Sequence, residues 1–448
     1  MPHLLYAFIF PLLLALLNST CENNEIEDMD HIVNPDDADE NKDPEVPQDT
    51  AKVRRTVLMY VSAQNSLGYR DFNEQDSIEI VNGRKFIKEN DRLLVYMDDE
   101  NHPRIYRYTA SKSTPEVVRT WDKDVNSSSP EVLEEVLKWT KAQYPAEEYG
   151  MVMWSHSDGW IPSTNKDYRS SSASTLSFGI DVGENGNMKY DEANNGKTGA
   201  QMDIDDMAKA IHNSGIHFKY IFFDSCLMQN LEVGYTLRGV TDYLIAAPIQ
   251  IPGCGANYTH MLEKGLFTDA EYDIVETYTK DATEGFDDYH NEYYDYGIVI
   301  SSIKTDQLEK LAQTTADVLS RSTLMEKTSP HMESVLHYQA YTPHYFYRPH
   351  NYDAQEAMRK ILNEKDFEKF KVALNEAVVS KGATKEFWIG PSNFNMQTVD
   401  LEKYSGVSMF IPQQDYSKNS SYCAYGDLNK AFQSTSWYTA AGWKITGW

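Results

Sequence analysis

The sequence contains only four cysteines among its 448 residues, at Cys21, Cys226, Cys254 and Cys423. This small number argues against a disulfide scaffold, because small secreted domains of that kind depend on many cysteines. The spacing also matches no zinc motif, in which Cys and His ligands recur at short fixed intervals. Cys254 and Cys423 could form a disulfide, but nothing in the sequence requires one.

Basic residues are scarce as well. The chain has 41 Lys and Arg against 68 Asp and Glu, and its formal net charge is -27. Nucleic-acid binding needs clustered cations that neutralise phosphates, so this balance argues against it. The acidity favours solubility and cationic partners. A solvated acidic surface is the simpler alternative, because twelve of the acidic side chains lie within residues 22–50.

The apolar run at residues 4–17 is interrupted by a proline and is too short to span a bilayer comfortably. It ends in Leu17-Asn18-Ser19-Thr20-Cys21, which is typical of a bacterial lipoprotein signal with Cys21 as the lipidated first residue. Thr20 replaces the usual Gly or Ala, and no Lys or Arg precedes the run, so an ordinary secretory signal is the alternative. We expect an exported chain, an outer-membrane or cell-surface lipoprotein of a Gram-negative bacterium, attached to the membrane only through the lipid.

The rest of the chain is long enough for one large α/β domain with an appendage, or for two domains. Residues 22–52 are acidic and poor in apolar side chains, which predicts a disordered tether. Predicted strands and helices then alternate through residues 53–260, which indicates a mainly parallel central sheet covered by helices on both faces. The predicted strands are 57–63, 92–97, 150–155, 219–224 and 243–246, and the predicted helices are 131–143, 204–213 and 227–238.

Residues 261–448 show a different pattern, with long predicted helices at 271–289, 305–319 and 365–379 and short predicted strands at 297–302 and 407–411. We expect a helix-rich C-terminal lobe that packs against the sheet edge and completes the functional unit.

Two apolar runs stop abruptly at a reactive residue. One ends at Ser155-His156-Ser157 and the other at Asp224-Ser225-Cys226. Both runs are typical of strands buried on two faces of a parallel sheet, whose carboxyl ends carry the chemistry. Taken singly, a buried Cys is usually a small hydrophobe and a strand-end His a satisfied polar group. Taken together, the two predict a nucleophile and its base on neighbouring strand ends.

Five segments then carry a family resemblance, in order along roughly residues 54–443. In this respect the chain resembles the clostripain-type cysteine peptidases of family C11, relatives of caspases, gingipains and legumains. The resemblance implies a caspase-like α/β/α sandwich and an endopeptidase that cleaves protein or peptide substrates after Arg or Lys. The segments are 56–67 (TVLMYVSAQNSL), 150–160 with His156, 224–228 (DSCLM), 247–253 (APIQIPG) and 405–412 (SGVSMFIP).

The resemblance implies that His156 and Cys226 act as a dyad. The backbone N–H groups of Ser157 and Cys226 would form the oxyanion hole. The family usually has Gly after the His, so Ser157 departs from the pattern and is costly if that position needs a positive φ. We also expect Cys226 to open the helix at 227–238, whose N-terminus would add positive potential at the thiol.

Specificity for a basic P1 residue needs a buried carboxylate, and Asp224 is the candidate at the family position. Asp224 lies two positions before Cys226, so both side chains can lie on the same face of the strand. A strand-end or helix-capping role is the alternative for Asp224. Trp160 and the loop 248–254, with Pro252, are the expected walls of the cleft.

The polar stretch between His156 and Cys226 contains Lys166 and Arg169, and the family matures by cutting itself there after a basic residue. An exposed loop that is never cut is the alternative. Within this stretch Asp181, Asn185, Asn187 and Glu192 superficially match a calcium-binding loop, but Gly183 occupies a ligand position. We therefore expect a polar turn and no required cofactor, with calcium left possible because the founding family member uses it.

Two functional classes remain after these observations. The first is a self-processing cysteine endopeptidase, favoured because both His156 and Cys226 are present. The second is a catalytically weak or inactive surface lipoprotein of the same fold that binds peptides or host ligands, which Ser157 and Cys254 leave open. A sugar-binding protein ranks last, because abundant Trp and Tyr are more often core residues.

Overall fold

The computed structural model describes residues 53–161, 177–184, 188, 199–270, 272–285, 287–339, 349–389, 396–417 and 427–448. The predicted signal with Cys21, the tether, the processing candidates Lys166 and Arg169, and Cys423 therefore lie outside the described residues.

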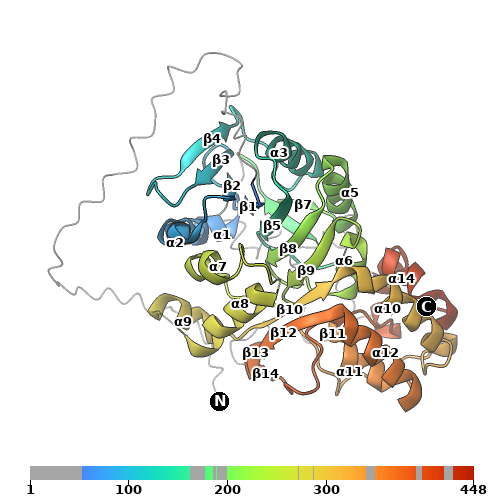
Figure 1. Cartoon of the computed structure of the whole chain (residues 1–448). Coiled ribbons are helices and arrows are strands. Elements are labelled where there is room, and N and C mark those ends of the chain that lie inside the picture. Colours follow the sequence, from blue (N-terminus) through green and yellow to red (C-terminus); the bar gives the residue numbers. More distant parts are fainter. Residues whose placement is uncertain are drawn as a thin grey trace, which may run out of the picture. The chain divides into compact units, whose positions relative to one another are not determined.

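A nine-stranded sheet in the order β12-β10-β9-β8-β5-β1-β2-β3-β4 forms the centre of the fold (Figure 1). The five central strands run parallel, and the two strands at each edge pair antiparallel. The predicted mainly parallel central sheet is therefore confirmed. The parallel strands are β1 (Arg55–Ser62), β2 (Asp91–Asp98), β5 (Glu148–Trp154), β8 (Phe218–Asp224) and β9 (Thr241–Ala246); the edge strands are β3 (Arg104–Tyr108), β4 (Glu116–Thr120), β10 (Val299–Lys304) and β12 (Val378–Ala383).

Each face of the sheet is covered by its own hydrophobic core. Because side chains alternate along a strand, Leu58 and Tyr60 of β1 enter one core and Val57 and Met59 enter the other. Helices complete both cores, which gives the α/β/α sandwich. The first core takes residues from α3 (Pro130–Gln143), α5 (Ile204–Ser214) and α6 (Leu231–Leu237), and the second from α2 (Phe72–Gly83), α7 (Tyr258–Lys264) and α8 (Tyr272–Glu284).

The C-terminal part continues the same sheet, because β10 pairs with β9 and β12 pairs with β10. Its helices α10 (Leu308–Leu319) and α12 (Glu364–Ala377) add to the first core, and all described residues belong to one compact unit. The remaining elements are α1 (Ser66–Tyr69), β6 (Phe178–Asp181), β7 (Ala200–Met202), α9 (Asp288–Tyr294), β11 (Tyr352–Asp353), α11 (Ala354–Ile361), β13 (Glu386–Trp388), β14 (Met396–Thr398), β15 (Ser408–Met409), α13 (Leu428–Gln433) and α14 (Ser436–Ala440), with short 3-10 turns between some of them.

Two predicted helices were wrong. The helix expected over 227–238 begins only at Leu231, because Leu227 has a left-handed backbone with φ 62° and Asn230 caps the first turn. The helix expected over 271–289 is two helices, α8 and α9, and Gly285 between them has φ 66°. Such a left-handed glycine is a common helix terminator.

The strand order fixes where side chains from different strands can meet. From β1 the chain passes to β2 on one side, and it later returns to β5 on the other side of β1. The carboxyl ends of β1 and β5 therefore border the crevice at which the strand order reverses, the usual place for a site in an open α/β sheet. In the described residues no helix is both long and apolar enough to cross a membrane.

Candidate active site

His156 and Cys226 follow neighbouring strands at the same level. Trp154 is the register partner of Asp224 in the parallel pair β5 and β8. Each reactive residue lies two positions beyond its partnered residue, so the two lie at adjacent strand ends. The structure thus brings the two predicted reactive residues to one edge of the sheet.

Strand β6 holds the loop that follows His156. Gly179 N–H donates to His156 O at 2.9 Å, and Asp158 N–H donates to Ser177 O at 3.0 Å. These two bonds flank the bridge between Ser157 and Phe178. In such an antiparallel pair the N–H of the central residue points away from the partner strand, so Ser157 N–H is directed away from β6.

Ser157 is compatible with the position where the family usually has glycine. Its backbone is not left-handed, so the side chain brings no strain of that kind. Its hydroxyl donates to Cys226 O at 2.5 Å. A glycine could not make this bond, which joins the loop after β5 to the loop after β8.

Ser66 contacts the imidazole of His156 directly, with 2.8 Å between Ser66 Oγ and His156 Nε2. Ser66 is the first residue of α1, and Asn65 before it is fully buried and caps this helix. Asn65 Nδ2 donates to Ser62 O at 2.9 Å and to Ile180 O at 2.8 Å. The ends of β1 and β6 therefore fix the position of Ser66. The sequence analysis did not single out this residue, although its place four residues after the end of β1, beside the predicted strand ends, was a usable signal.

Cys226 is half-buried and lies on a tight turn. Leu227 after it has the left-handed backbone, and Leu227 N–H donates to Ile249 O at 2.8 Å. Burial of the thiol raises the pKa of Cys226 to about 12; a hydrogen bond from Ile251 N–H opposes this, and the charges of Asp158 and Asp224 add to it. Since α6 begins only at Leu231, the expected help from a helix N-terminus is absent, and the thiol is protonated at neutral pH.

Asp224 is 3% exposed and is held by the loop after β9. Its Oδ2 accepts hydrogen bonds from Ala256 N–H at 3.1 Å and Tyr258 OH at 2.8 Å, whereas its Oδ1 is buried without a partner. Burial raises the pKa of Asp224 to about 6, against these two bonds. Because Asn230 caps α6, the helix-capping alternative for Asp224 is wrong.

Gly255 is needed where the loop passes Asp224. It has φ 58°, and a Cβ there would lie 2.6 Å from Asp224 Oδ2. Any other residue would both strain the backbone and displace the carboxylate. Pro252 is buried in the same loop, and its carbonyl accepts a hydrogen bond from Gly255 N–H at 3.0 Å.

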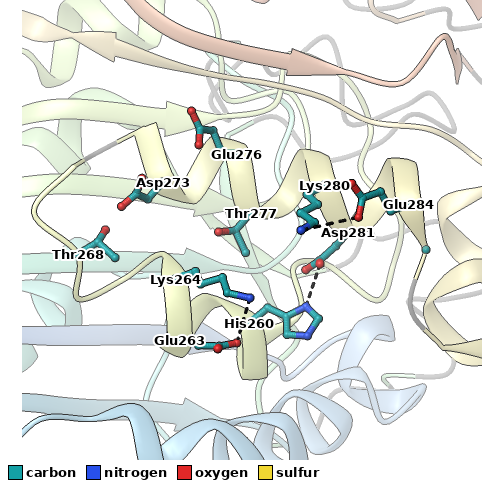
Figure 2. Close-up of a pocket in the computed structure, with 11 residues that line it drawn as sticks. His260, Glu263, Lys264, Thr268, Asp273, Glu276, Thr277, Lys280, Asp281 and Glu284 are labelled. Atoms are coloured by element: carbon teal, nitrogen blue, oxygen red, sulfur yellow. Dashed lines mark hydrogen bonds and ion pairs between the residues drawn. The ribbon is translucent and has the colours of Figure 1, made fainter.

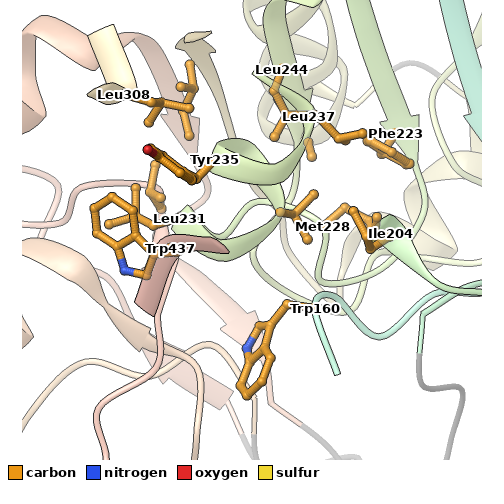
Figure 3. Close-up of a cluster of buried hydrophobic side chains, with 14 of the residues drawn as sticks. Trp160, Ile204, Phe223, Met228, Leu231, Tyr235, Leu237, Leu244, Leu308 and Trp437 are labelled. Carbon is orange, nitrogen blue, oxygen red and sulfur yellow. The ribbon is translucent and has the colours of Figure 1, made fainter. Parts of the chain in front are cut away.

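Trp160, an expected wall of the cleft, packs in the first core and borders a small pocket that neither His156 nor Cys226 lines. It is 6% exposed, and its ring makes edge contacts with Phe410 and Phe432, at centroid distances of 5.3 and 5.8 Å. Figure 3 shows it with other side chains of the first core, among them Met228 and Leu231. Its size and apolar surface are used for packing.

An open groove of about 540 Å³ lies between α7 and α8 (Figure 2). His260 Nδ1 and Asp281 Oδ1 are 2.8 Å apart in it, and Lys264 and Lys280 pair with neighbouring glutamates. Neither His156 nor Cys226 lines this groove. This groove is therefore separate from the predicted reactive residues.

The calcium-like segment begins in a strand. Asp181 ends β6, and its Oδ2 accepts from Ser127 N–H at 2.6 Å while its Oδ1 accepts from Gly183 N–H at 2.8 Å. The other matching positions, Asn185, Asn187 and Glu192, lie outside the described residues. Within the described ranges no group of three or more His, Cys, Asp or Glu side chains could hold a metal ion.

Comparisons with known proteins find relatives of the same fold. A secreted C11 cysteine protease from Bacteroides thetaiotaomicron, solved with an irreversible peptide inhibitor, superposes with a TM-score of 0.69 at 30% identity, over 87% of this chain and 99% of that one. An inactive zymogen C11 protease from Parabacteroides distasonis gives 0.66 at 27% identity, over 87% and 98%.

Clostripain from Hathewaya histolytica is 22% identical over 262 residues, which are 50% of this chain and 46% of clostripain. The chain thus spans less than half the length of this curated relative. The sequence profile of the clostripain family, Peptidase C11, matches residues 59–448. The match covers most of the chain, and the chain belongs to the clostripain family.

Proposed function

We propose that the chain is an exported cysteine endopeptidase that cleaves after Arg or Lys, with Cys226 as nucleophile and His156 as base. The observation that carries this proposal is the placement of both residues at the ends of neighbouring strands. Membership of the clostripain family supports it, as does the relative from B. thetaiotaomicron that holds a peptide inhibitor.

The raised thiol pKa shapes the proposed mechanism. His156 takes the proton from Cys226 as the sulfur attacks the scissile carbonyl carbon, and Ser157 N–H and Cys226 N–H stabilise the oxyanion. The C–N bond breaks as His156 returns the proton to the leaving amine. Water then attacks the thioester, gives a proton to His156, and the sulfur leaves and regains that proton. The two side chains need no cofactor for these steps.

Asp224 is the proposed counter-charge for the P1 side chain. Its position two residues before Cys226 and its buried, unpartnered Oδ1 support this role. With a pKa of about 6 it is mostly ionised at neutral pH, and a guanidinium or ammonium would compensate the buried charge.

Self-processing after Lys166 or Arg169 is a further part of the proposal. Both are basic residues in a polar stretch between the strands that carry the dyad. A relative described as an inactive zymogen supports the idea that this family has a precursor form. N-terminal sequencing of the active protein should find a second chain that begins after one of these residues, and Cys226→Ala should stay a single chain.

Export with a lipid on Cys21 is also proposed, supported by the sequence of residues 4–21 and by a relative described as secreted. Labelling with a fatty-acid analogue in a Gram-negative host tests it. Wild type should carry the label and Cys21→Ala should not.

The decisive experiment incubates the protein with arginyl, lysyl and norleucyl reporter peptides, with and without EDTA and calcium. We expect hydrolysis of the basic reporters and none by Cys226→Ala. Alkylation should label Cys226 before Cys254, which is only 2% exposed. A folded protein that binds these peptides without cutting them would replace this proposal by the non-catalytic alternative.

A further inference from the structure

Helix α2 brings carboxylates to the back of the proposed P1 pocket. Tyr258 connects the two regions: its backbone N–H donates to Glu79 Oε2 at 2.8 Å, and its hydroxyl donates to Asp224 Oδ2 at 2.8 Å. One tyrosine therefore spans the distance between α2 and the end of β8. Asp76 precedes Glu79 by one helical turn, so it lies on the same face of α2.

Two further contacts place Asp76 beside Asp224. The side chain of Trp154 hydrogen-bonds to Asp76, and Trp154 is the register partner of Asp224. The start of α2 also packs on the loop that holds Asp224, since a Cβ on Gly253 would lie 2.7 Å from Phe72 Cζ. Asp76 and Asp224 thus lie on neighbouring elements, α2 and the end of β8, that Trp154 and Tyr258 connect.

Each of these two carboxylates is only partly satisfied. Asp76 and Asp224 are each 3% exposed, and one oxygen of each, Asp76 Oδ2 and Asp224 Oδ1, is buried without a hydrogen-bond partner. Throughout the described ranges, no Lys, Arg or His forms an ion pair with either residue. Glu79 differs, because His290 Nε2 lies 3.0 Å from its Oε1. Burial disfavours the charged form of both carboxyls and raises the pKa of each, and a cation that entered between them would favour the ionised pair.

We propose that Asp76 is a second carboxylate of the P1 pocket and that the pair Asp76 and Asp224 selects Arg over Lys. The inference rests on the proposed function, in which a basic P1 side chain enters beside Asp224. A guanidinium presents five N–H donors in a planar fork, so it can bond two carboxylates on different elements at once. It is also less strongly hydrated than an ammonium, which lowers the penalty for entering a dry pocket.

The test compares kcat/KM for matched arginyl and lysyl reporters in wild type and Asp76→Asn. We expect wild type to prefer Arg. The substitution should lower kcat/KM about 10-fold or more for Arg and only about threefold for Lys, because the fork loses one of its two acceptors. Glu74→Gln, an exposed carboxylate on the same helix, is the matched control and should change neither value.

The outcomes separate this inference from the function on which it rests. If Asp224→Asn abolishes cleavage after both residues but Asp76→Asn leaves the Arg to Lys ratio unchanged, the inference is wrong and the proposed function stands. If Asp224→Asn changes neither reporter, the proposed P1 pocket itself is wrong. An equal fall for both reporters in Asp76→Asn would also overturn the selectivity.

Wild type alone provides a second measurement should Asp76→Asn fail to fold. Agmatine and 1,5-diaminopentane have similar length. Agmatine ends in a guanidinium, whereas the diamine has a second ammonium in its place. Agmatine should inhibit hydrolysis with an inhibition constant at least about fivefold lower. Equal constants, or a lower one for the diamine, would contradict selection by a carboxylate pair.

Discussion

The two sides of Cys226 are built from different chemistry. On the side of His156, neutral groups make short hydrogen bonds: Ser66 to the imidazole, Asn65 to two backbone carbonyls, and Ser157 to Cys226 O. On the opposite side, Asp224 and Asp76 are carboxylates with buried oxygens that have no hydrogen-bond partner.

From this difference we expect the neutral groups to position the catalytic side chains and the carboxylates to bind the substrate. Neutral hydrogen bonds fix geometry without changing the net charge near the thiol. The buried carboxylates act through charge: burial is the main cause of the raised pKa of Cys226 and of Asp76, and the charge of Asp224 raises both further. A cation beside the carboxylates would favour their ionised forms. Substitutions on the charged side should therefore alter which substrates are cut, and those on the neutral side should alter how fast.

Asp224→Asn should have the largest effect. Removing the counter-charge should lower kcat/KM for arginyl and lysyl reporters by about 100-fold, because the substrate cation would enter a pocket that lacks its partner. Thermal stability should not fall, since an unpaired buried charge is removed. Asp122→Asn, an exposed carboxylate, is the control. Unchanged selectivity for basic P1 residues would place the counter-charge elsewhere. The carboxylate side of Cys226 would then have no role in binding the substrate.

Ser66→Ala should have the next largest effect, through His156. Losing one hydrogen bond to the imidazole should lower kcat by about 10-fold with KM nearly unchanged. The limb of the pH–rate profile that reports His156 should move, and Ser66→Thr, which keeps a hydroxyl, should recover most activity. Ser77→Ala removes a hydroxyl that donates to Asn73 O within α2, remote from His156, and serves as control. A change in KM alone, with kcat and the pH–rate profile unchanged, would show that Ser66 does not position the imidazole.

The sequence predicted that His156 and Cys226 lie at strand ends because each follows an uninterrupted apolar strand. Apolar runs such as 150–154 and 219–223 fit buried parallel strands, and the first reactive side chain after each run is His156 or Cys226. The edge strand β4 carries no such signal, because it is mostly exposed and lacks both an apolar run and strict alternation.

Asp76 and the start of α6 were missed for physical reasons that can be named. Helix α2 buries Asn73, Asp76 and Glu79, so its inner face is polar and shows no apolar periodicity. Leu227 and Met228 continue the apolar character of β8 and resemble the first turn of a helix, whereas the tertiary turn at Cys226 forces Leu227 into a left-handed conformation. Asn230, the actual N-cap, was the available signal.

Ser157→Gly should lower the stability of the fold and leave the reaction rate nearly unchanged. The oxyanion donor is the backbone N–H, which glycine retains, so activity should stay within about threefold of wild type. Loss of the bond to Cys226 O and the greater freedom of glycine should lower the unfolding free energy by about 1–2 kcal/mol. Ser157→Ala separates the two contributions. Activity raised tenfold by glycine would instead mean that Ser157 impairs the site.

The smallest expected effect concerns Glu79, the one carboxylate of the charged side that has its own cation. His290 Nε2 lies 3.0 Å from Glu79 Oε1, and His290 Nδ1 lies 3.0 Å from Asp287 Oδ1. Burial lowers the pKa of His290, but the carboxylates of Glu79 and Asp287 outweigh it and raise that pKa above its ordinary 6.5. The folded protein therefore holds this proton more tightly than the unfolded chain does.

This stabilisation is fully present below pH 6.5 and is lost as the pH rises through the raised pKa of His290. Between pH 6.5 and 9 the melting temperature of wild type should fall by about 1–2 °C more than that of His290→Gln. His217→Gln, at an exposed histidine beside Asp242, should follow wild type. Parallel curves for wild type and His290→Gln would show that the ion pair does not stabilise the fold. Glu79 would then lack an effective counter-charge, as Asp76 and Asp224 do, and three carboxylates without a cation would lie near the proposed P1 pocket.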